Sequence, residues 1–210
     1  MSREAHVQFC ERLGVELPGA THRLVHCRNE QEAQALKSEL QARLAECRLE
    51  MHPTKTKIAY CKDKKRKGRY PNVKFDFLGY CFRPRLVRRL RDNTLFCGFN
   101  PAVSSSAMKA MRSTIRELKL HHQTQLSLQD IAQQLNPLLR GWIEYYGRYA
   151  PSALYPLLRH VNQTLVAWAM RKFKRFKDHK IRASQFLQRL ATEHRALFVH
   201  WGIGMTGVFA

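Results

Sequence analysis

The chain has 210 residues, of which 44% are hydrophobic, so it is long and apolar enough to bury a core as one large or two small domains. Lysine and arginine total 37 against 16 aspartates and glutamates, which gives a formal net charge of +21 and favours a polyanionic partner. No apolar run approaches the ~20 residues of a membrane helix, and no secretion signal is recognisable, so we expect a cytoplasmic protein that binds nucleic acid rather than a membrane.

The first part of the chain predicts a strand followed by a helix. Residues 1–20 carry weak signals and are expected to form a short helix or a loosely held tail. The apolar pair Leu24-Val25 predicts a short strand, and Asn29 with Glu32 three residues later is a capping-box pattern that begins a helix over 29–49. One face of this helix is expected to be buried, because apolar residues recur on it at helical spacing: Ala33, Leu36, Leu40, Leu44 and Cys47.

Short strands and a basic loop follow. Residues 57–61 predict a strand, and 62–72 form a loop rich in lysine and arginine, with Gly68 and Pro71 as turn residues. The aromatic stretch 73–82 predicts a hairpin or bent strand around Gly79, and residues 94–98 predict a last small strand.

From Ser104 onward the pattern is helical. Met108, Met111, Ile115 and Leu118 form an apolar stripe opposite a basic one. A second capping box, Ser127 with Asp130, begins another helix, which Asn136-Pro137 is expected to interrupt and restart. Further helices are predicted from Ser152 and over 183–196, and 197–204 should fold back as an apolar strap.

Catalytic and metal-binding patterns are sparse. The six cysteines have no zinc-ligand spacing and are interpreted as reduced packing residues. Nucleotidyl transfer needs carboxylates that hold two divalent metals, and the first aspartate of the chain is Asp63, inside the basic loop. Asp76 and Asp92 are a conceivable metal pair, but neither has a partner carboxylate nearby in the sequence. His121-His122 is interpreted as a helix end, where cations suit the dipole, rather than as a metal or phosphate site.

Three basic clusters, 62–69, 83–91 and 171–182, lie among aromatic residues. Lysine and arginine contact phosphates and aromatic faces stack on unpaired bases, so this combination predicts nucleic-acid binding. The alternative is a solvated face that only keeps the protein soluble. The absence of any comparable acidic cluster favours binding.

One segment carries a family resemblance. The sequence 135-LNPLLRGWIEYYGRY-149 resembles the core of the group II intron maturase-specific domain, the helical thumb that follows the reverse-transcriptase palm. The stretch 48–85, with Lys55-Thr56 and 75-FDFLGY-80, is similar to the last palm segments of that family. Segments 154–177 and 197–201 fit the end of its bacterial members.

The resemblance implies an α+β fold, with residues 1–19 unassigned, a truncated palm over 20–103, a helical maturase-specific thumb over 104–201 and a tail over 202–210. In this alignment Thr21 and His22 stand where the family has its two metal-binding aspartates, and neither replaces a magnesium-binding carboxylate. The resemblance therefore implies no polymerase activity, no catalytic residue and no cofactor or metal, with magnesium relevant only if another chain supplied a complete palm.

The function implied by the resemblance is binding of folded group II intron RNA to assist splicing, with DNA as a further nucleic-acid candidate and self-association through an exposed palm edge. Two alternatives stay open: a mobile-element remnant without function, and a subunit that completes a split RNA-directed DNA polymerase. The candidate RNA contacts are Lys64, Lys65, Arg66, Lys67, Arg83, Arg85, Arg88, Arg89, Arg112, Arg116, Arg140, Arg148, Arg171, Lys172, Lys174 and Arg175.

Overall fold

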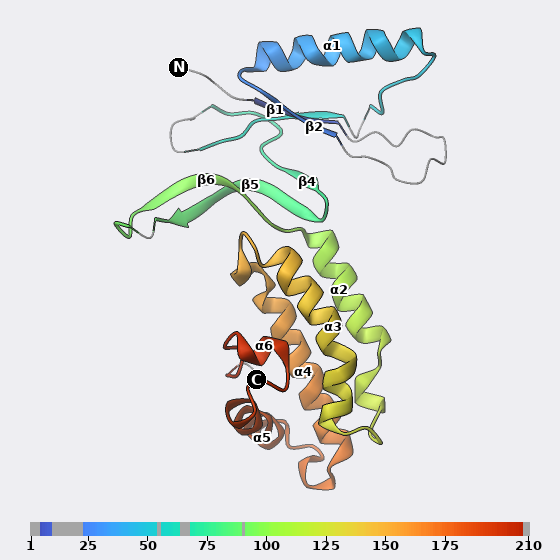
Figure 1. Cartoon of the computed structure of the whole chain (residues 1–210), viewed down its shortest axis with the longest axis vertical. Coiled ribbons are helices and arrows are strands. Elements are labelled where there is room, and N and C mark those ends of the chain that lie inside the picture. Colours follow the sequence, from blue (N-terminus) through green and yellow to red (C-terminus); the bar gives the residue numbers. More distant parts are fainter. Residues whose placement is uncertain (1–4, 10–22, 54–55, 64–67, 90, 208–210) are drawn as a thin grey trace. The chain divides into compact units, whose positions relative to one another are not determined.

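The computed structural model describes residues 5–9, 23–53, 56–63, 68–89 and 91–207 (Figure 1). The chain divides into two compact units, Met1–Pro101 and Ala102–Ala210. The first combines strands with one helix and the second is helical, so the predicted α+β class is confirmed.

A three-stranded antiparallel sheet organises the start of the first unit. Its strands are β1 (Ala5–Phe9), β2 (Arg23–Cys27) and β3 (Lys57–Ala59), in the order β2-β1-β3. The strand predicted at Leu24-Val25 is confirmed as part of β2. The short helix or tail expected for residues 1–20 is wrong over Ala5–Phe9, because the alternating sequence AHVQF forms the central strand instead.

Helix α1 (Glu30–Glu46) packs against β1 and β2. Its predicted cap is confirmed: the Glu32 backbone N–H donates to Asn29 Oδ1 at 2.8 Å, and the Arg28 N–H donates to the Glu32 carboxylate at 2.7 Å. Among the described residues, the buried cluster below α1 consists of Cys27 and Ala33, with Leu36 and Leu40 partly covered. Cys47 is exposed, so the predicted buried face ends before it.

The second sheet of this unit has the order β4-β5-β6, with β4 at Phe75–Phe77, β5 at Tyr80–Arg88 and β6 at Leu95–Val103. The hairpin predicted around Gly79 is confirmed. Leu78 and Gly79 have φ of 48° and 78°, the positive values that a two-residue type I′ turn requires. Phe75 and Phe82 are cross-strand partners whose ring centroids lie 4.8 Å apart.

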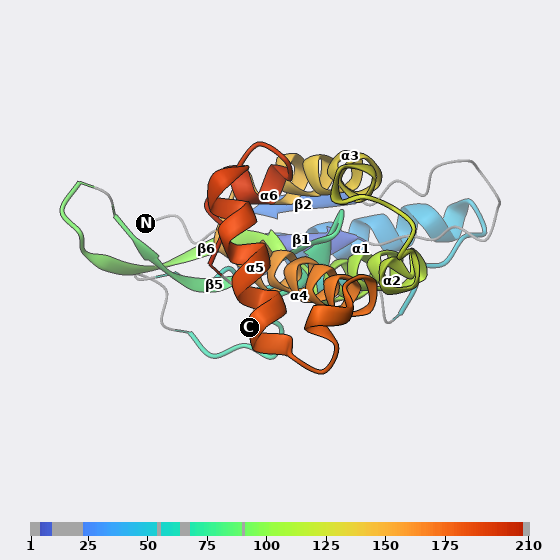
Figure 2. The same ribbon diagram turned by 90° about the horizontal axis from the view of Figure 1, so that it is seen from below.

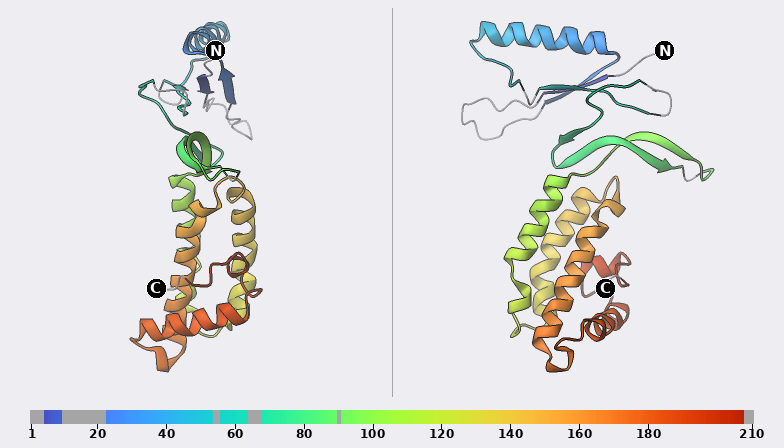
Figure 3. Two further views of the ribbon diagram at one scale, coloured as in Figure 1. Left: turned by 90° about the vertical axis from the view of Figure 1, so that its left-hand side faces the viewer. Right: turned by 180° about the vertical axis from the view of Figure 1, so that it is seen from behind.

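The second unit is a helical bundle. Its helices are α2 (Ser105–Glu117), α3 (Leu128–Tyr146), α4 (Tyr155–Lys172), α5 (Lys180–Glu193) and α6 (Val199–Gly202), with 3-10 turns η1 (Leu120–His122), η2 (Pro151–Leu154) and η3 (Lys174–Phe176). Figure 2 shows α4 between α2 and α5, and Figure 3 shows α5 crossing the ends of the other helices. The predicted capping box of Ser127 with Asp130 is confirmed, and the helix expected from Ser104 begins with Ser104 as its N-cap.

The predicted interruption at Asn136-Pro137 is wrong, because α3 is continuous through it. Pro137 removes one backbone donor from the helix. Asn136 serves the tertiary structure rather than a cap: its amide donates to Leu197 O at 2.9 Å and accepts from the Val199 N–H at 3.0 Å. The segment after α5 is thereby fastened to the middle of α3.

The apolar strap predicted over 197–204 is confirmed for its first part, where Phe198, His200 and Trp201 are buried, but residues 202–204 are exposed; buried Asn162 of α4 holds the strap in place. Asn162 donates to Met205 O at 2.9 Å, and its Oδ1 accepts from His200 Nε2 at 2.7 Å and Trp201 Nε1 at 3.1 Å. Burial lowers the pKa of His200 to about 3, because an imidazolium would lose its hydration here. The imidazole of His200, which is part of the strap, is therefore buried in its neutral form.

Candidate nucleic-acid interface

The helical unit carries a strong excess of positive charge. Residues 102–210 contain 16 lysines and arginines against five aspartates and glutamates. On α2 the two predicted faces are confirmed: Met111 and Ile115 are buried, while Lys109 and Arg116 are exposed. Packing of the apolar stripe thus leaves the basic stripe toward solvent.

Helix α4 places a histidine beside this basic stripe. Burial, followed by the charges of Arg112 and Arg116, lowers the pKa of His160. Because the imidazole is therefore neutral near pH 7, the local charge is carried by the two arginines. Arg112 is half-buried and Arg116 is exposed.

The end of α4 meets the turn that follows α2. Arg171 Nη1 lies 3.0 Å from His122 Nδ1, which brings together residues from two distant segments. Lys172 is engaged with the protein itself, because its ammonium donates to the carbonyls of Thr124 and Leu126 and lies 5.3 Å from the Trp168 ring. Of these two predicted RNA contacts, Arg171 is the exposed one and Lys172 is half-buried.

Arg175 of η3 has the most defined surroundings of the predicted contacts. Its guanidinium lies 5.6 Å from the Phe173 ring, 4.6 Å from Phe176 and 5.1 Å from Phe186, within the range of cation–π attraction. The neighbouring Lys174 is exposed.

Arg140 and Arg148 lie at separate places on the family-like segment 135–149. Arg140 is exposed in the second half of α3, and Arg148 follows the helix, 5.9 Å from the exposed Tyr149 ring. The same segment buries Leu135 and Leu139 in the core, so its apolar pattern serves packing while its arginines face solvent.

The predicted contacts of the first unit divide in the same way. Arg83 and Arg88 of β5 are exposed. Arg85 is half-buried and donates to Asn100 O at 3.3 Å and Cys81 O at 3.4 Å; burial, followed by Arg83, lowers its pKa. Arg89 pairs with Asp92 at 3.3 Å. Lys64, Lys65, Arg66 and Lys67 lie outside the described residues.

The positions of the expected aspartate pair, Thr21 and His22, also lie outside the described residues. Within the described ranges, no three His, Cys, Asp or Glu side chains come together as a metal site. Asp92 is engaged locally, since hydrogen bonds from the hydroxyl and backbone of Thr94 hold the pKa of its carboxyl below the usual range.

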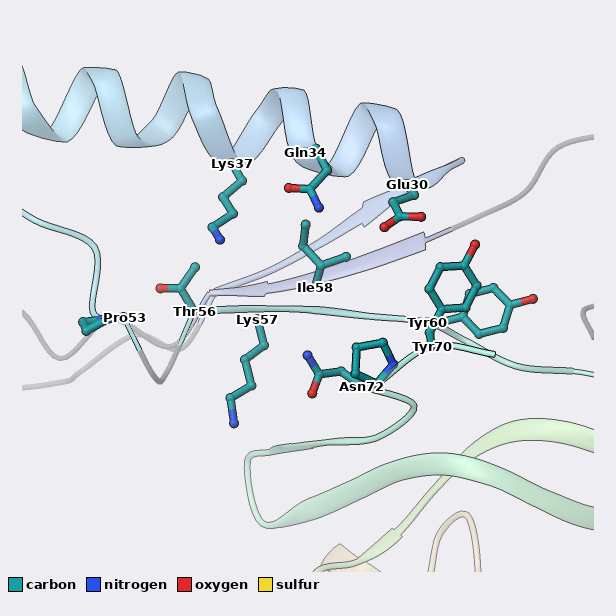
Figure 4. Close-up of a pocket in the computed structure, with 11 residues that line it drawn as sticks. Glu30, Gln34, Lys37, Pro53, Thr56, Lys57, Ile58, Tyr60, Tyr70 and Asn72 are labelled. Carbon is teal, nitrogen blue, oxygen red and sulfur yellow. The ribbon is translucent and has the colours of Figure 1, made fainter. Parts of the chain in front are cut away.

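A pocket of about 520 Å³ in the first unit was not suggested by the sequence (Figure 4). Glu30 and Lys37 extend into it from α1, and the rings of Tyr60 and Tyr70 lie 4.2 Å apart at one side. Thr56 Oγ1, on its wall, is buried without a hydrogen-bond partner in the described structure. Because acidic and basic residues both line this pocket, its charge does not favour a phosphate ligand.

Two arginines of α5, Arg182 and Arg189, join Arg175 around a further pocket. Sequence reasoning did not single them out, although Arg182 stands at the end of the third basic cluster. Arg182 precedes the helix predicted over 183–196, so the sequence did not put the two arginines on one helix; in α5 their seven-residue spacing places both on one face.

Residues 108–186 match the family described as "Group II intron, maturase-specific domain", a stretch from α2 into α5. Neither the curated proteins nor the solved structures contain a match to the chain. No helix among the described residues is both long and apolar enough to cross a bilayer.

Proposed function

We propose that this chain, which carries a group II intron maturase-specific domain over residues 108–186, binds folded group II intron RNA and assists its splicing. The family match carries the proposal. It falls on the part of the molecule with the larger core and the strong positive excess, so the domain is both folded and suited to a polyanion.

The exposed cations of the helical unit supply the phosphate contacts. Among the predicted contacts, we assign this role to Arg116, Arg140, Arg148, Arg171, Lys174 and Arg175, which are exposed, with half-buried Arg112 beside them. Lys172 instead supports this surface by binding the loop after η1. Such contacts fix the position of an RNA backbone without reading its sequence, so selectivity for the intron would come from RNA shape.

The proposed activity needs no catalytic side chain, because the intron RNA performs the splicing chemistry. The matched domain is not itself a catalytic polymerase domain. Thr21 and His22 at the aspartate positions support the absence of polymerisation. Primer extension with magnesium by the purified chain alone would contradict this part of the proposal.

Filter binding of the full chain to a group II intron RNA and to an unrelated structured RNA of equal length tests the proposal. We expect tighter binding to the intron, and affinity for both RNAs that falls steeply with salt as counterions are released. Equal affinity for the two RNAs would leave only nonspecific binding. A duplex DNA competitor in the same assay measures the preference for RNA.

We also propose self-association through the small sheet. In the described part of the chain, β2 and β3 are edge strands with no further strand paired outside them. Unpaired strand edges are templates for pairing with another chain. Sedimentation at increasing protein concentration tests this, and a constant monomeric mass would contradict it.

A further inference from the structure

A second basic feature lies at the junction of η3 and α5. A pocket of about 420 Å³ is lined by three arginines, Arg175, Arg182 and Arg189, together with Gln185 and apolar residues. The planar guanidinium of arginine can donate two hydrogen bonds to phosphate oxygens. Three arginines in one pocket are therefore suited to binding phosphate groups.

The side chain of Arg175 is positioned by aromatic rings in a way that favours binding of an anion. Three phenylalanine rings lie within 6 Å of its guanidinium: Phe176 at 4.6 Å, Phe186 at 5.1 Å and Phe173 at 5.6 Å. These rings restrict a long side chain that would otherwise lose rotamer freedom on binding. Arg175 as a residue remains exposed.

The other two arginines project from one face of α5. Residues 182, 185 and 189 are spaced by three and four, so their side chains point the same way, with Gln185 between the cations. Glu193 is the acidic residue of the lining. No ion pair within 4 Å joins it to Arg182 or Arg189 in the described chain, so their charge is available to a ligand.

A larger pocket of about 760 Å³ adjoins this site and shares Phe186, Leu190 and Glu193 with it. Its walls include the half-buried rings of Phe173 and Phe186, whereas Trp168, also in the lining, is only 2% exposed and offers little surface. Cations beside aromatic walls suit a nucleotide strand whose bases are free to leave the stack, because aromatic side chains accept unpaired bases. A duplex keeps its bases paired and offers nothing to the apolar pocket.

We infer that the three-arginine pocket binds backbone phosphates of unpaired RNA, with the adjoining aromatic pocket receiving a base. The inference rests on the proposed RNA binding and adds a defined site to it. It places an intron's single-stranded loops, rather than its helices, against η3 and α5.

The test compares two single-charge variants of the full chain, Arg189→Gln in the pocket and Arg159→Gln on exposed α4 outside it. The probes are a short oligouridylate and an RNA duplex of equal length. For oligouridylate we expect Arg189→Gln to weaken binding roughly tenfold and to reduce the slope of log affinity against log salt by about 0.7, as for one lost phosphate contact to a single strand. Arg159→Gln should weaken it much less.

Phe186→Leu tests the positioning of Arg175 separately, since it removes a ring and no charge. It should weaken oligouridylate binding by several-fold while leaving the salt slope unchanged. Circular dichroism and thermal unfolding verify that each variant is folded. If a variant fails to fold, an NMR measurement on the wild-type chain takes its place. The side-chain Nε–H signals of the three arginines should then shift on addition of inorganic pyrophosphate.

Equal losses for Arg189→Gln and Arg159→Gln, or duplex bound as tightly as oligouridylate, would overturn the inference. So would arginine signals that pyrophosphate leaves unmoved. Failure of the proposed function looks different: the wild type would bind intron and unrelated RNA equally, yet the pocket variants would still lose oligouridylate. Intron preference with no pocket effect would leave the proposed function standing and remove this site.

Discussion

The two units solve the problem of burying apolar surface very differently. The helical unit gathers 23 buried residues into one continuous cluster that includes Trp168, Phe198 and Trp201. In the first unit, the described cluster below α1 has Cys27 and Ala33 as its buried residues, Ala59, Cys61, Phe75 and Tyr80 are buried outside it, and Leu36, Leu40 and Leu44 on α1 are half-exposed. A bundle covers each helix from several sides, whereas α1 has the small sheet on one side.

The difference teaches where a function is best supported. Binding of a folded polyanion needs cations on a rigid scaffold. The helical unit offers such cations on helices that pack around a large buried core. In the first unit, the basic cluster 83–91 lies largely on strand β5. Two of its arginines are already engaged with the protein, because Arg85 donates to Asn100 O and Arg89 donates to Asp92. We therefore assign the proposed RNA-binding surface mainly to the second unit.

The largest expected effect compares one leucine from each core. Leu165→Ala, at a fully buried position of α4, should lower the free energy of unfolding of the helical unit by about 2–5 kcal/mol. Leu40→Ala, at a half-exposed position of α1, should cost about 1 kcal/mol, because less apolar surface returns to water. Urea unfolding followed by segment-resolved hydrogen exchange measures both. Equal costs would break the comparison between the two cores.

Loss of the buried amide under the strap ranks second. Asn162→Ala leaves the buried donors of His200 and Trp201 and the carbonyl of Met205 without their partner, which should cost about 2–4 kcal/mol. Thermal unfolding followed by tryptophan fluorescence measures the loss. Gln163→Ala, at the exposed neighbouring position, is the matched control and should change little. If Asn162→Ala lowered stability no more than the control, the prediction that Asn162 holds the strap against the core would be contradicted.

Acid should act selectively on the helical unit through His200. Its folded pKa of about 3 lies below the ordinary value of 6.5, so the unfolded state binds more protons between these two pH values. The contribution is complete above pH 6.5 and is lost as the pH falls toward 3, by at most about 1.4 kcal/mol per pH unit. Urea unfolding at several pH values should show a shallower loss for His200→Gln. The exposed His194→Gln should follow the wild type.

The smallest effect sharpens the comparison by applying the same change to both units. Ser127→Ala and Asn29→Ala each remove a side-chain cap and should each cost about 1 kcal/mol of helix stability. The loss is a larger share of the stability where the core is thin, so hydrogen exchange should accelerate along all of α1 but only in the first turn of α3. Exchange confined to the first turn of both helices would contradict this.

Much of the local structure follows directly from short stretches of sequence. The caps at Asn29, Ser104 and Ser127 and the turn at Gly79 were all predictable, because each depends on a side chain that bonds within a few residues or on a backbone conformation that glycine permits. The basic and apolar faces of α2 follow from helical periodicity in the same way. The family resemblance over 135–149 agrees with the match over 108–186.

Other features depend on partners far away in the chain, which no local pattern contains. β1 is a central strand because β2 and β3 pair with it, and Asn136 serves the strap rather than a helix cap because its partners stand some 60 positions later. Arg175 acquires its aromatic surroundings from Phe186 on the next helix. The sequence by itself determined charge, caps and helical faces, since these arise from neighbouring residues. Only the tertiary structure decided which cations are engaged with the protein and which ones face solvent, because long-range packing brings carbonyls and rings to some of them.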